Sequence, residues 1–394
     1  MNRRGGFDVA VVGAGMVGSA VALALAQKGL RVCLIEEREP ARWSVSDELD
    51  LRVVALAPSS VNLLRSLGVW DAIAAARVSP YRHMHVWDAQ NGATLDFDAA
   101  TLGESELGYI VENRLLQHVL WQALLGHPGI EVRSPARVVE TRADEQGRAL
   151  LLDDDRRVTA QLVVAADGGN SALRAMLGIA TRGEDYAQRA LVAHVRTELP
   201  HAQTAWQRFL PGGPLALLPL ADGRSSIVWT LPEVEAERML ALDDSVFCKE
   251  LGCAFDFRLG PILATSPRAA FPLRLQLAER YIDARFALIG DAAHSVHPLA
   301  GQGVNLGFRD VEELVECLVD ASERGRDIAA ESTLRRYERR RRSDNAIAGH
   351  AFGALNRIFR WSAEPAVLAR GLGMRMVGTI GPVRNALARH AAGR

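Results

Sequence analysis

The sequence predicts an α/β protein with a second, antiparallel sheet. Three observations predict it. A strand, a glycine-rich turn, a helix and a second strand follow one another over residues 7–36. Buried-strand patterns at residues 162–166 and 286–289 each end beside a Gly and an Asp, and β-like runs recur between residues 191 and 231. The 394 residues are enough for two or three domains.

The first motif lies near the N-terminus. Residues 7–12 are an apolar, β-branched run, residues 19–28 are rich in Ala and Leu, and residues 30–35 form a second apolar run. Gly13-Ala-Gly15-Met-Val-Gly18 stands between the first run and the helix. This order predicts a Rossmann-like strand–helix–strand unit that binds a nucleotide.

Each glycine of this turn has a physical task. Gly13 permits the tight turn, Gly15 lets the backbone approach a pyrophosphate, and Gly18 brings the helix close to the strand. The N-terminus of the helix adds unpaired N–H donors and a partial positive charge. Glu36 follows the second strand, where a carboxylate can accept hydrogen bonds from a ribose diol. This motif predicts a nucleotide without deciding between NAD and FAD.

Two later motifs favour a flavin. Asp167-Gly168 and Gly290-Asp291 each follow a predicted strand, where a carboxylate can hydrogen-bond a sugar-alcohol chain. Gly301-Gln302-Gly303 then opens an amphipathic helix that continues to about residue 320. Backbone N–H groups gathered at that turn suit a ring system that becomes anionic when it is reduced.

Composition excludes several classes of protein. The net charge is −1, so the whole chain has no basic field for nucleic acid. The four cysteines are scattered without a Cys-x-x-Cys, which fits a reducing compartment better than a zinc or disulfide framework. The uncharged run at residues 9–26 contains three glycines and is better explained by the nucleotide turn than by a signal peptide. We expect a cytoplasmic protein, with peripheral contact to the inner membrane left open.

Charge is unevenly distributed along the chain. Residues 335–394 hold 13 Arg against three acidic residues, a net of +10, so the preceding residues carry −11. This basic segment indicates either docking to an anionic membrane or partner protein, or a solvated helix face.

The motifs predict a discontinuous domain organisation. The FAD-binding domain is expected to comprise residues 1–75, 101–180 and 280–345. The substrate domain is expected to comprise residues 76–100 and 181–279, which form an antiparallel sheet, and residues 346–394 form a basic helical C-terminal segment. We expect the substrate pocket between the two domains. Its candidate lining residues are Trp206, Phe209, Leu217, Pro219 and Trp229, with ordinary sheet core as the alternative for each.

The three motifs together resemble the FAD signatures of the single-component aromatic hydroxylases typified by hydroxybenzoate hydroxylase. Within that group the sequence is most similar to the ubiquinone-biosynthesis hydroxylases, and closest to those that act on a polyprenyl methyl-methoxy-benzoquinol. The resemblance extends to about residue 350. Further local matches are Asp50-x-Arg52-x-x-Ala55-Leu56, Leu67-Gly-Val-Trp70, Pro80-Tyr81-Arg82, Gly108-Tyr109-x-Val-Glu112-Asn113-x-Leu-x-Gln117, Tyr337 and Asp344-Asn345.

The resemblance implies bound FAD and a set of residues around it. It places the adenosine ribose at Glu36, the pyrophosphate–ribityl region at Asp291, and Arg52 and Gln117 on the other side of the cofactor. The alternatives are an Asp167–Arg174 ion pair and a surface ion pair between Arg52 and Asp50. The complete set of cofactor-binding candidates is Gly13, Gly15, Met16, Val17, Gly18, Glu36, Glu37, Arg52, Gln117, Asp167, Gly290, Asp291, Pro298, Gly301, Gln302, Gly303, Val304 and Asn305.

Two histidines raise the question of a metal or a catalytic base. His294 and His297 are three residues apart, but no third ligand is in register, so we expect no metal. His297 precedes Pro298, which favours an extended backbone and can direct the imidazole towards the substrate. His297 and Pro298 are therefore the candidate catalytic residues, with His297 accepting a quinol proton; neutral packing is the alternative.

By this resemblance the chain is an FAD-dependent monooxygenase that hydroxylates a polyprenylated phenol or benzoquinol ring. NAD(P)H acts as a transient co-substrate and O₂ reacts through a flavin C4a-hydroperoxide. The expected partners are the polyprenylated aromatic substrate, proteins of a ubiquinone-biosynthesis complex and a membrane surface, without nucleic acid. The alternatives are a noncatalytic FAD-binding assembly subunit, or a flavin reductase or halogenase relative.

Overall fold

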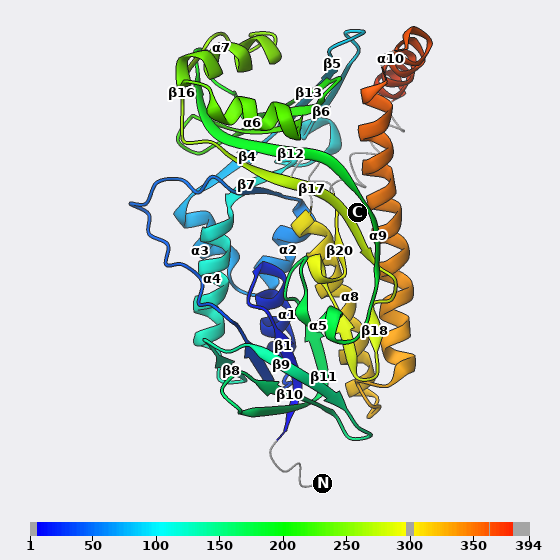
Figure 1. The fold of residues 1–394 in the computed structure, drawn as a ribbon. Helices are drawn as coiled ribbons and strands as arrows, with labels where there is room; N and C mark the ends of the chain where they lie inside the picture. Colours follow the sequence, from blue (N-terminus) through cyan, green and yellow to red (C-terminus); the bar gives the residue numbers. More distant parts are fainter. Residues whose placement is uncertain (1–5, 297–302, 362, 381–394) are drawn as a thin grey trace.

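The computed structural model describes residues 6–296, 303–361 and 363–380. His297, Pro298, Gly301 and Gln302 of the expected site therefore lie outside the described residues. In the described part of the chain, a mostly parallel sheet with helices packed against it forms one half of the molecule, and a larger sheet forms the other (Figure 1).

The first sheet is built on the N-terminal motif. Its strands run in the order β18-β19-β11-β1-β2-β8, and β19, β11, β1, β2 and β8 are mutually parallel. Parallel strands buried on both faces have continuous apolar sequences, as residues 9–12 of β1 do. The strands are β1 (Phe7–Val12), β2 (Val32–Ile35), β8 (Ile130–Arg133), β9 (Val138–Ala143), β10 (Arg148–Leu152), β11 (Arg157–Ala165), β18 (Ile282–Asp283) and β19 (Phe286–Leu288).

The second sheet has nine strands in the described chain and is antiparallel except where β13 pairs with β5. Its path is β20-β17-β12-β15-β14-β13-β5-β6, with β16 added to β12. Two segments far apart in sequence thus share one sheet. The strands are β5 (His83–Asp88), β6 (Thr94–Asp98), β12 (Thr181–Thr197), β13 (Thr204–Leu210), β14 (Gly213–Pro219), β15 (Ser225–Pro232), β16 (Ile262–Thr265), β17 (Ala269–Ala278) and β20 (His294–Ser295).

A three-stranded sheet lies between the two halves, and helices cover the sheets. The small sheet has the order β3-β7-β4, formed by β3 (Val53–Leu56), β7 (Gly108–Glu112) and β4 (Val78–Tyr81). The helices are α1 (Met16–Gln27), α2 (Pro58–Ser66), α3 (Trp70–Ala76), α4 (Asn113–Leu125), α5 (Ala172–Met176), α6 (Glu233–Ala241), α7 (Asp244–Ala254), α8 (Gly303–Glu323), α9 (Glu331–Arg360) and α10 (Glu364–Thr379), with single 3₁₀ turns at Ala100–Leu102 and Gly290–Ala292.

The predicted fold class is confirmed. The strand–helix–strand unit at the N-terminus, the strands that precede Asp167 and Gly290, and the antiparallel sheet all form. The helix predicted after the Gly-Gln-Gly turn is α8, which packs on α1 and α9. The contact between α1 and α8 places the helix of the N-terminal glycine motif against the helix that follows the Gly-Gln-Gly motif.

The C-terminal part differs from the separate tail that the sequence suggested. Residues 331–360 form one continuous helix, α9, so the boundary expected between residues 345 and 346 falls inside it. This helix contacts β18 of the first sheet and β13, β14 and β17 of the second, and Figure 1 shows it running along both. Its length therefore spans the two halves of the molecule. No helix in the described chain is both long and apolar enough to cross a bilayer.

Candidate active site

A cavity of about 420 Å³ opens between the first and second sheets. On one side it is lined by the glycine-rich turn and the Gly290–Asp291 loop, and on the other by strands of the second sheet. Its volume lies in the range of ligand pockets. The sequence-predicted residues among its walls are Gly15, Met16, Val17, Arg52, Gly290, Asp291, Gly303 and Val304.

The glycine turn is shaped by two close backbone approaches and one open space. A Cβ on Gly18 would lie 1.9 Å from the Gly13 carbonyl oxygen, and a Cβ on Gly13, where φ is +102°, would lie 2.4 Å from the Ala166 carbonyl oxygen. A Cβ on Gly15 would meet nothing within 4 Å. Gly13 and Gly18 are therefore required by packing, whereas Gly15 leaves space that belongs to the cavity. The N-cap of α1 is Gly15, whose lack of a side chain leaves the first-turn amides uncapped by any side chain.

Glu36 and Gln117 reach this turn from two different elements. The Glu36 carboxylate accepts a 2.5 Å hydrogen bond from the Ala14 N–H, and the Gln117 amide donates to the Ala14 carbonyl at 3.3 Å. A carboxylate has about four acceptor sites, so this bond leaves Glu36 able to accept from a ribose. Glu37 is exposed just after Glu36.

Two buried polar atoms near the cavity favour a bound ligand. Asn113, at the start of α4, lines the cavity, and its Oδ1 is buried with no hydrogen-bond partner among the described residues. One oxygen of Asp167 accepts from the Leu173 N–H at 3.2 Å, while the other is buried and has no partner in the same part of the chain. Because an unsatisfied buried acceptor costs free energy, these atoms favour a donor-bearing ligand nearby. Asn113 was not among the cofactor-binding residues predicted from the sequence.

Arg174 joins the two Asp-Gly loops rather than pairing with Asp167 alone. Its guanidinium donates to the Ala292 carbonyl at 2.8 Å and to the Gly169 carbonyl at 2.7 Å. The loop after β11 and the loop after β19 are thereby held together at one edge of the first sheet.

Asp291 opens into the cavity and is accessible there, although protein atoms surround most of the carboxylate. This surrounding raises the pKa of Asp291 by desolvation, against the opposing charges of His294 and Arg52. A carboxylate placed in this way suits hydroxyl donors of a ligand.

The beginning of α8 forms another part of the wall. Gly303 and Val304 line the cavity, and a Cβ on Gly303 would meet nothing within 4 Å. Asn305 is different, because its side chain is directed into the protein. It accepts from Ala57 N–H at 2.9 Å and Ser60 Oγ at 2.7 Å, and donates to the Ala55 carbonyl at 2.8 Å. Asn305 fixes α8 on β3 and α2 instead of presenting its side chain to the cavity.

Asp310 is the buried centre behind the Gly290–Asp291 loop. It is fully buried and accepts hydrogen bonds from Gly290 N–H at 2.9 Å, His294 Nε2 at 2.5 Å and Arg341 Nε at 2.8 Å. Asn345 Nδ2 donates to it at 3.1 Å. Burial by itself raises the pKa of Asp310, but His294 and Arg341 outweigh burial and lower it to about 2.

Asp310 was not among the residues predicted from the sequence, although the sequence contains a signal for it. The residue lies on the apolar stripe of α8, seven positions after Gly303, where an unpaired carboxylate would be costly. The structure also shows His294 bound to Asp310, so this imidazole has a structural partner. Among the described residues no group of three His, Cys, Asp or Glu side chains could hold a metal.

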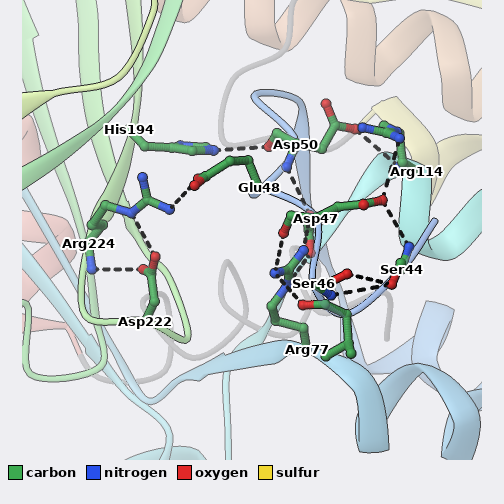
Figure 2. A network of polar contacts seen from close by, with 12 residues as sticks. Ser44, Ser46, Asp47, Glu48, Asp50, Arg77, Arg114, His194, Asp222 and Arg224 are labelled. Carbon is green, nitrogen blue, oxygen red and sulfur yellow. Dashed lines mark hydrogen bonds and ion pairs between the residues drawn. The ribbon is translucent and has the colours of Figure 1, made fainter.

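A polar network fixes the loop that carries Arg52 (Figure 2). Arg77 pairs with the buried Glu112 at 2.7 Å and donates to the Asp47 carbonyl at 2.9 Å. Glu112 accepts from the Asp50 N–H at 2.8 Å, which sets the start of β3. Arg52 itself lies in the cavity wall with its guanidinium 5.4 Å from the centre of the Phe271 ring. The hydrogen bond between Arg52 and Asp50 involves the backbone N–H of Arg52.

The same loop contacts the second sheet. His194 Nε2, on β12, donates to the Asp50 carbonyl at 3.0 Å, and Arg224 lies 3.7 Å from Glu48 (Figure 2). Burial lowers the pKa of His194 and so favours the neutral imidazole, whereas the hydrogen bond to the Asp50 carbonyl acts in the opposite direction. These contacts therefore hold the loop around Asp50 against the second sheet beside the cavity.

The second sheet presents an almost uncharged wall to the cavity. Its lining residues on β12, β14 and β15 are Ala190, Val192, Leu218, Ser226 and Val228. None of the five residues expected to line the pocket is among the described lining residues. Leu217, Trp206 and Trp229 pack with α6 and α7 on the opposite face, because successive side chains of a strand alternate between faces. Their neighbours Leu218 and Val228 face the cavity instead.

The residues present fit FAD. The open space at Gly15 and Gly303, the uncapped amides of α1, the unpaired acceptors and the carboxylates of Glu36 and Asp291 provide the donors and acceptors that a dinucleotide needs. Gly13, Gly18 and Gly290 shape the backbone around that space.

Comparison with known proteins agrees with this geometry. The FAD binding domain family matches residues 6–347. The chain is 39% identical over 386 residues to the 3-demethoxyubiquinol 3-hydroxylase of Escherichia coli, covering 98% of both chains. It is also 39% identical to the ubiquinone hydroxylase UbiL of Rhodospirillum rubrum, covering 98% of this chain and 89% of that protein. The structure of p-nitrophenol 4-monooxygenase PnpA from Pseudomonas putida superposes with a TM-score of 0.79 at 20% identity, covering 98% and 97% of the two chains, and shows the shared fold.

Two glycine substitutions separate packing from ligand space. Gly18→Ala should destabilise the protein by about 1–3 kcal/mol, because its methyl group overlaps the Gly13 carbonyl and α1 must shift. Gly15→Ala should leave the stability of the FAD-free protein unchanged and weaken FAD binding, because its methyl group enters the cavity. Urea unfolding of the FAD-free protein and FAD titration by flavin fluorescence measure the two effects. Unweakened FAD binding by the Gly15 variant would contradict the assignment.

Asp310→Asn should lower the free energy of unfolding by about 3–5 kcal/mol, since it leaves the buried Arg341 with only the exposed Asp344 as a counter-charge. The pKa of Asp310 in the folded protein, about 2, lies below its ordinary value of 3.8. The ionised carboxylate therefore contributes its full stabilisation of the fold above pH 3.8, and this stabilisation is lost as the pH falls towards 2. Denaturant unfolding at several pH values should show the difference between wild type and variant shrinking below about pH 4. The control Asp244→Asn removes an exposed ion pair with Arg268 and should change stability little.

Proposed function

The chain belongs to the FAD-dependent monooxygenases that carry this FAD binding domain, and we propose that it hydroxylates the aromatic ring of a polyprenylated quinol in ubiquinone biosynthesis. NAD(P)H and O₂ are the other reactants. The observation that carries the proposal is a cavity with nucleotide-turn residues on one side and an apolar sheet wall on the other.

Bound FAD supplies the redox chemistry, taking electrons from NAD(P)H and activating O₂ for transfer of one oxygen atom to the ring. The protein's residues bind and orient. The amides at the start of α1 lie where a pyrophosphate can be held, and Glu36 lies where a ribose can be held. The start of α8, at Gly303 and Val304, places a helix N-terminus beside the cavity, which stabilises negative charge there.

The opposite wall selects a neutral, apolar ring. Val192, Leu218 and Val228 exclude water and offer dispersion contacts to an aromatic substrate. Among the described lining residues, the basic side chains are Arg52, which lies over Phe271, and Arg274, which pairs with Asp185 at 3.1 Å. The strands β12, β14 and β15 therefore contribute no basic residue to the cavity lining, which favours a quinol over a benzoate on that side of the cavity.

Ser226 is the polar group of this wall. It lies on β15 among the cavity-lining residues, it is fully buried, and its Oγ has no hydrogen-bond partner within the described part of the chain. A hydroxyl can both donate to and accept from a phenolic OH. We infer that Ser226 orients the quinol by a hydrogen bond to a ring hydroxyl. The proposed quinol proton acceptor, His297, lies beside Pro298 outside the described residues.

Contacts with a membrane and with other proteins are also part of the proposal. A polyprenyl tail is apolar and partitions into a bilayer, so peripheral contact through the basic C-terminal part would bring the enzyme to its substrate. Association with other proteins of the same pathway is compatible with that location. A noncatalytic assembly subunit that only binds FAD is the rival function, and turnover distinguishes the two.

Incubation with NAD(P)H, a short-chain quinol analogue and oxygen-18 gas should yield a product that gains one labelled oxygen atom, measured by mass spectrometry. NAD(P)H oxidation should be faster when the quinol is present. Hydroxylation without label, or FAD binding with no quinol-dependent NAD(P)H oxidation, would contradict a monooxygenase and favour the assembly subunit.

Ser226→Ala should raise KM for the quinol by roughly 2- to 12-fold while FAD content stays unchanged, because a hydrogen bond with a net contribution of about 0.5–1.5 kcal/mol is lost. The neighbouring Ser225 also has an unpaired buried Oγ but is absent from the cavity lining, so Ser225→Ala is the matched control. Equal KM values for the two variants would refute the role of Ser226.

A further inference from the structure

Helix α10 exposes an apolar stripe and buries an arginine, which lies on the inward side together with Met374. Its outward side chains include Leu368, Leu372 and Met376, which are 66%, 61% and 61% exposed. These positions are four residues apart and form one stripe along the helix, continued by Ile380. A surface helix normally turns such a stripe towards the core.

A charged residue occupies the inward face instead. Arg370 is 7% exposed and pairs with the buried Asp88 of β5 at 2.6 Å. It also donates to the carbonyls of Ile358 and Trp361, at the end of α9, and to Gln90 Oε1. Its guanidinium lies 5.0 Å from the centre of the Phe359 ring. Because each of these bonds has a defined geometry, Arg370 fixes the rotation of α10 about its axis.

Glycines on the same inward face permit the close contact. A Cβ on Gly371 would lie 3.0 Å from the Asn91 side chain, and a Cβ on Gly378 would lie 3.7 Å from Leu95. Asn91 also donates to the Val367 carbonyl at 3.0 Å. Figure 1 shows α10 standing beside β5 and β6 at the end of the second sheet, beyond the end of α9. The stripe is therefore held outward by specific contacts beneath it.

Charge in this part of the sequence indicates what covers the stripe. Glu364 begins α10, four residues before Leu368, and after it the sequence contains no Asp or Glu. The charged residues that follow are Arg370, which pairs with Asp88, the exposed Arg375 and, beyond the described residues, Arg384, Arg389 and Arg394. Arg375 is exposed on α10 beside the apolar stripe. Two copies of such a surface would repel each other, whereas anionic lipid headgroups would attract it.

We propose that the outward face of α10, formed by Leu368, Leu372, Met376 and Ile380, docks on an anionic lipid bilayer, and that the buried Arg370–Asp88 pair holds this face in the docking orientation. The proposal deepens and rests on the proposed function, because a polyprenyl substrate resides in a bilayer. An apolar stripe that enters the headgroup–acyl boundary, flanked by arginine, is typical of interfacial helices.

The test uses the full-length, FAD-loaded protein and vesicle flotation. Vesicles of phosphatidylcholine with about 30 mol% phosphatidylglycerol should carry wild-type protein upward, and vesicles of phosphatidylcholine alone should carry much less. The triple variant Leu368→Glu, Leu372→Glu, Met376→Glu should lose at least about tenfold in the vesicle-bound fraction.

The matched control changes three exposed apolar residues elsewhere to Glu, namely Val234, Val246 and Leu263. It adds the same charge and should float like wild type. Both variants should keep their FAD absorbance and should oxidise NAD(P)H with a water-soluble, short-chain quinol at the wild-type rate. This second readout tests the proposed function separately, because docking can fail while turnover is normal.

Three results would overturn the docking proposal. Wild type and triple variant could float equally, or neither could float. Alternatively, light scattering without lipid could show a wild-type dimer that the triple variant dissociates, which would make a second copy of the chain the occupant.

Discussion

The buried carboxylate of Asp310 is the interaction on which the rest of the site depends. One side chain accepts hydrogen bonds from a loop amide, an imidazole, a guanidinium and an amide side chain, and these donors come from the β19 loop, β20 and α9. Desolvating a lone carboxylate to this degree would be prohibitive, so the arrangement exists only when all four partners are in place. The consequence is that the loop bearing Gly290 and Asp291 is tied to both long helices.

The cavity lies where this anchored loop faces a wall built by a different sheet. Its two sides are supplied by segments separated by more than a hundred residues, and the polar loop around Asp50 braces one against the other through His194 and Glu48. Function therefore follows from the junction of the sheets. The first sheet holds the nucleotide turn, the second supplies the apolar surface, and neither would enclose a reactive ring and exclude water alone.

A similar division of polar and apolar groups operates at the far end of the molecule. The Arg370–Asp88 pair places charge beneath α10 and leaves leucine and methionine side chains outside. A buried ion pair contributes little net stability compared with apolar packing, but its hydrogen-bond geometry specifies one orientation. In α10 that orientation exposes Leu368, Leu372 and Met376 to solvent. Stability alone would not favour this arrangement, because apolar side chains are normally buried in a water-soluble protein.

The sequence by itself determined the strand–helix–strand unit, the glycine turn, the Asp-Gly loops and the antiparallel sheet, because each depends on local spacing and on what glycine allows. Tertiary structure decided the rest. The cavity wall uses Leu218 and Val228 rather than Leu217 and Trp229, since a one-residue step changes the face of a strand and only the position of α6 and α7 shows which face is core. The partners of Asp310 and Arg370 are also tertiary, because their bonds join residues that only folding brings within 3 Å.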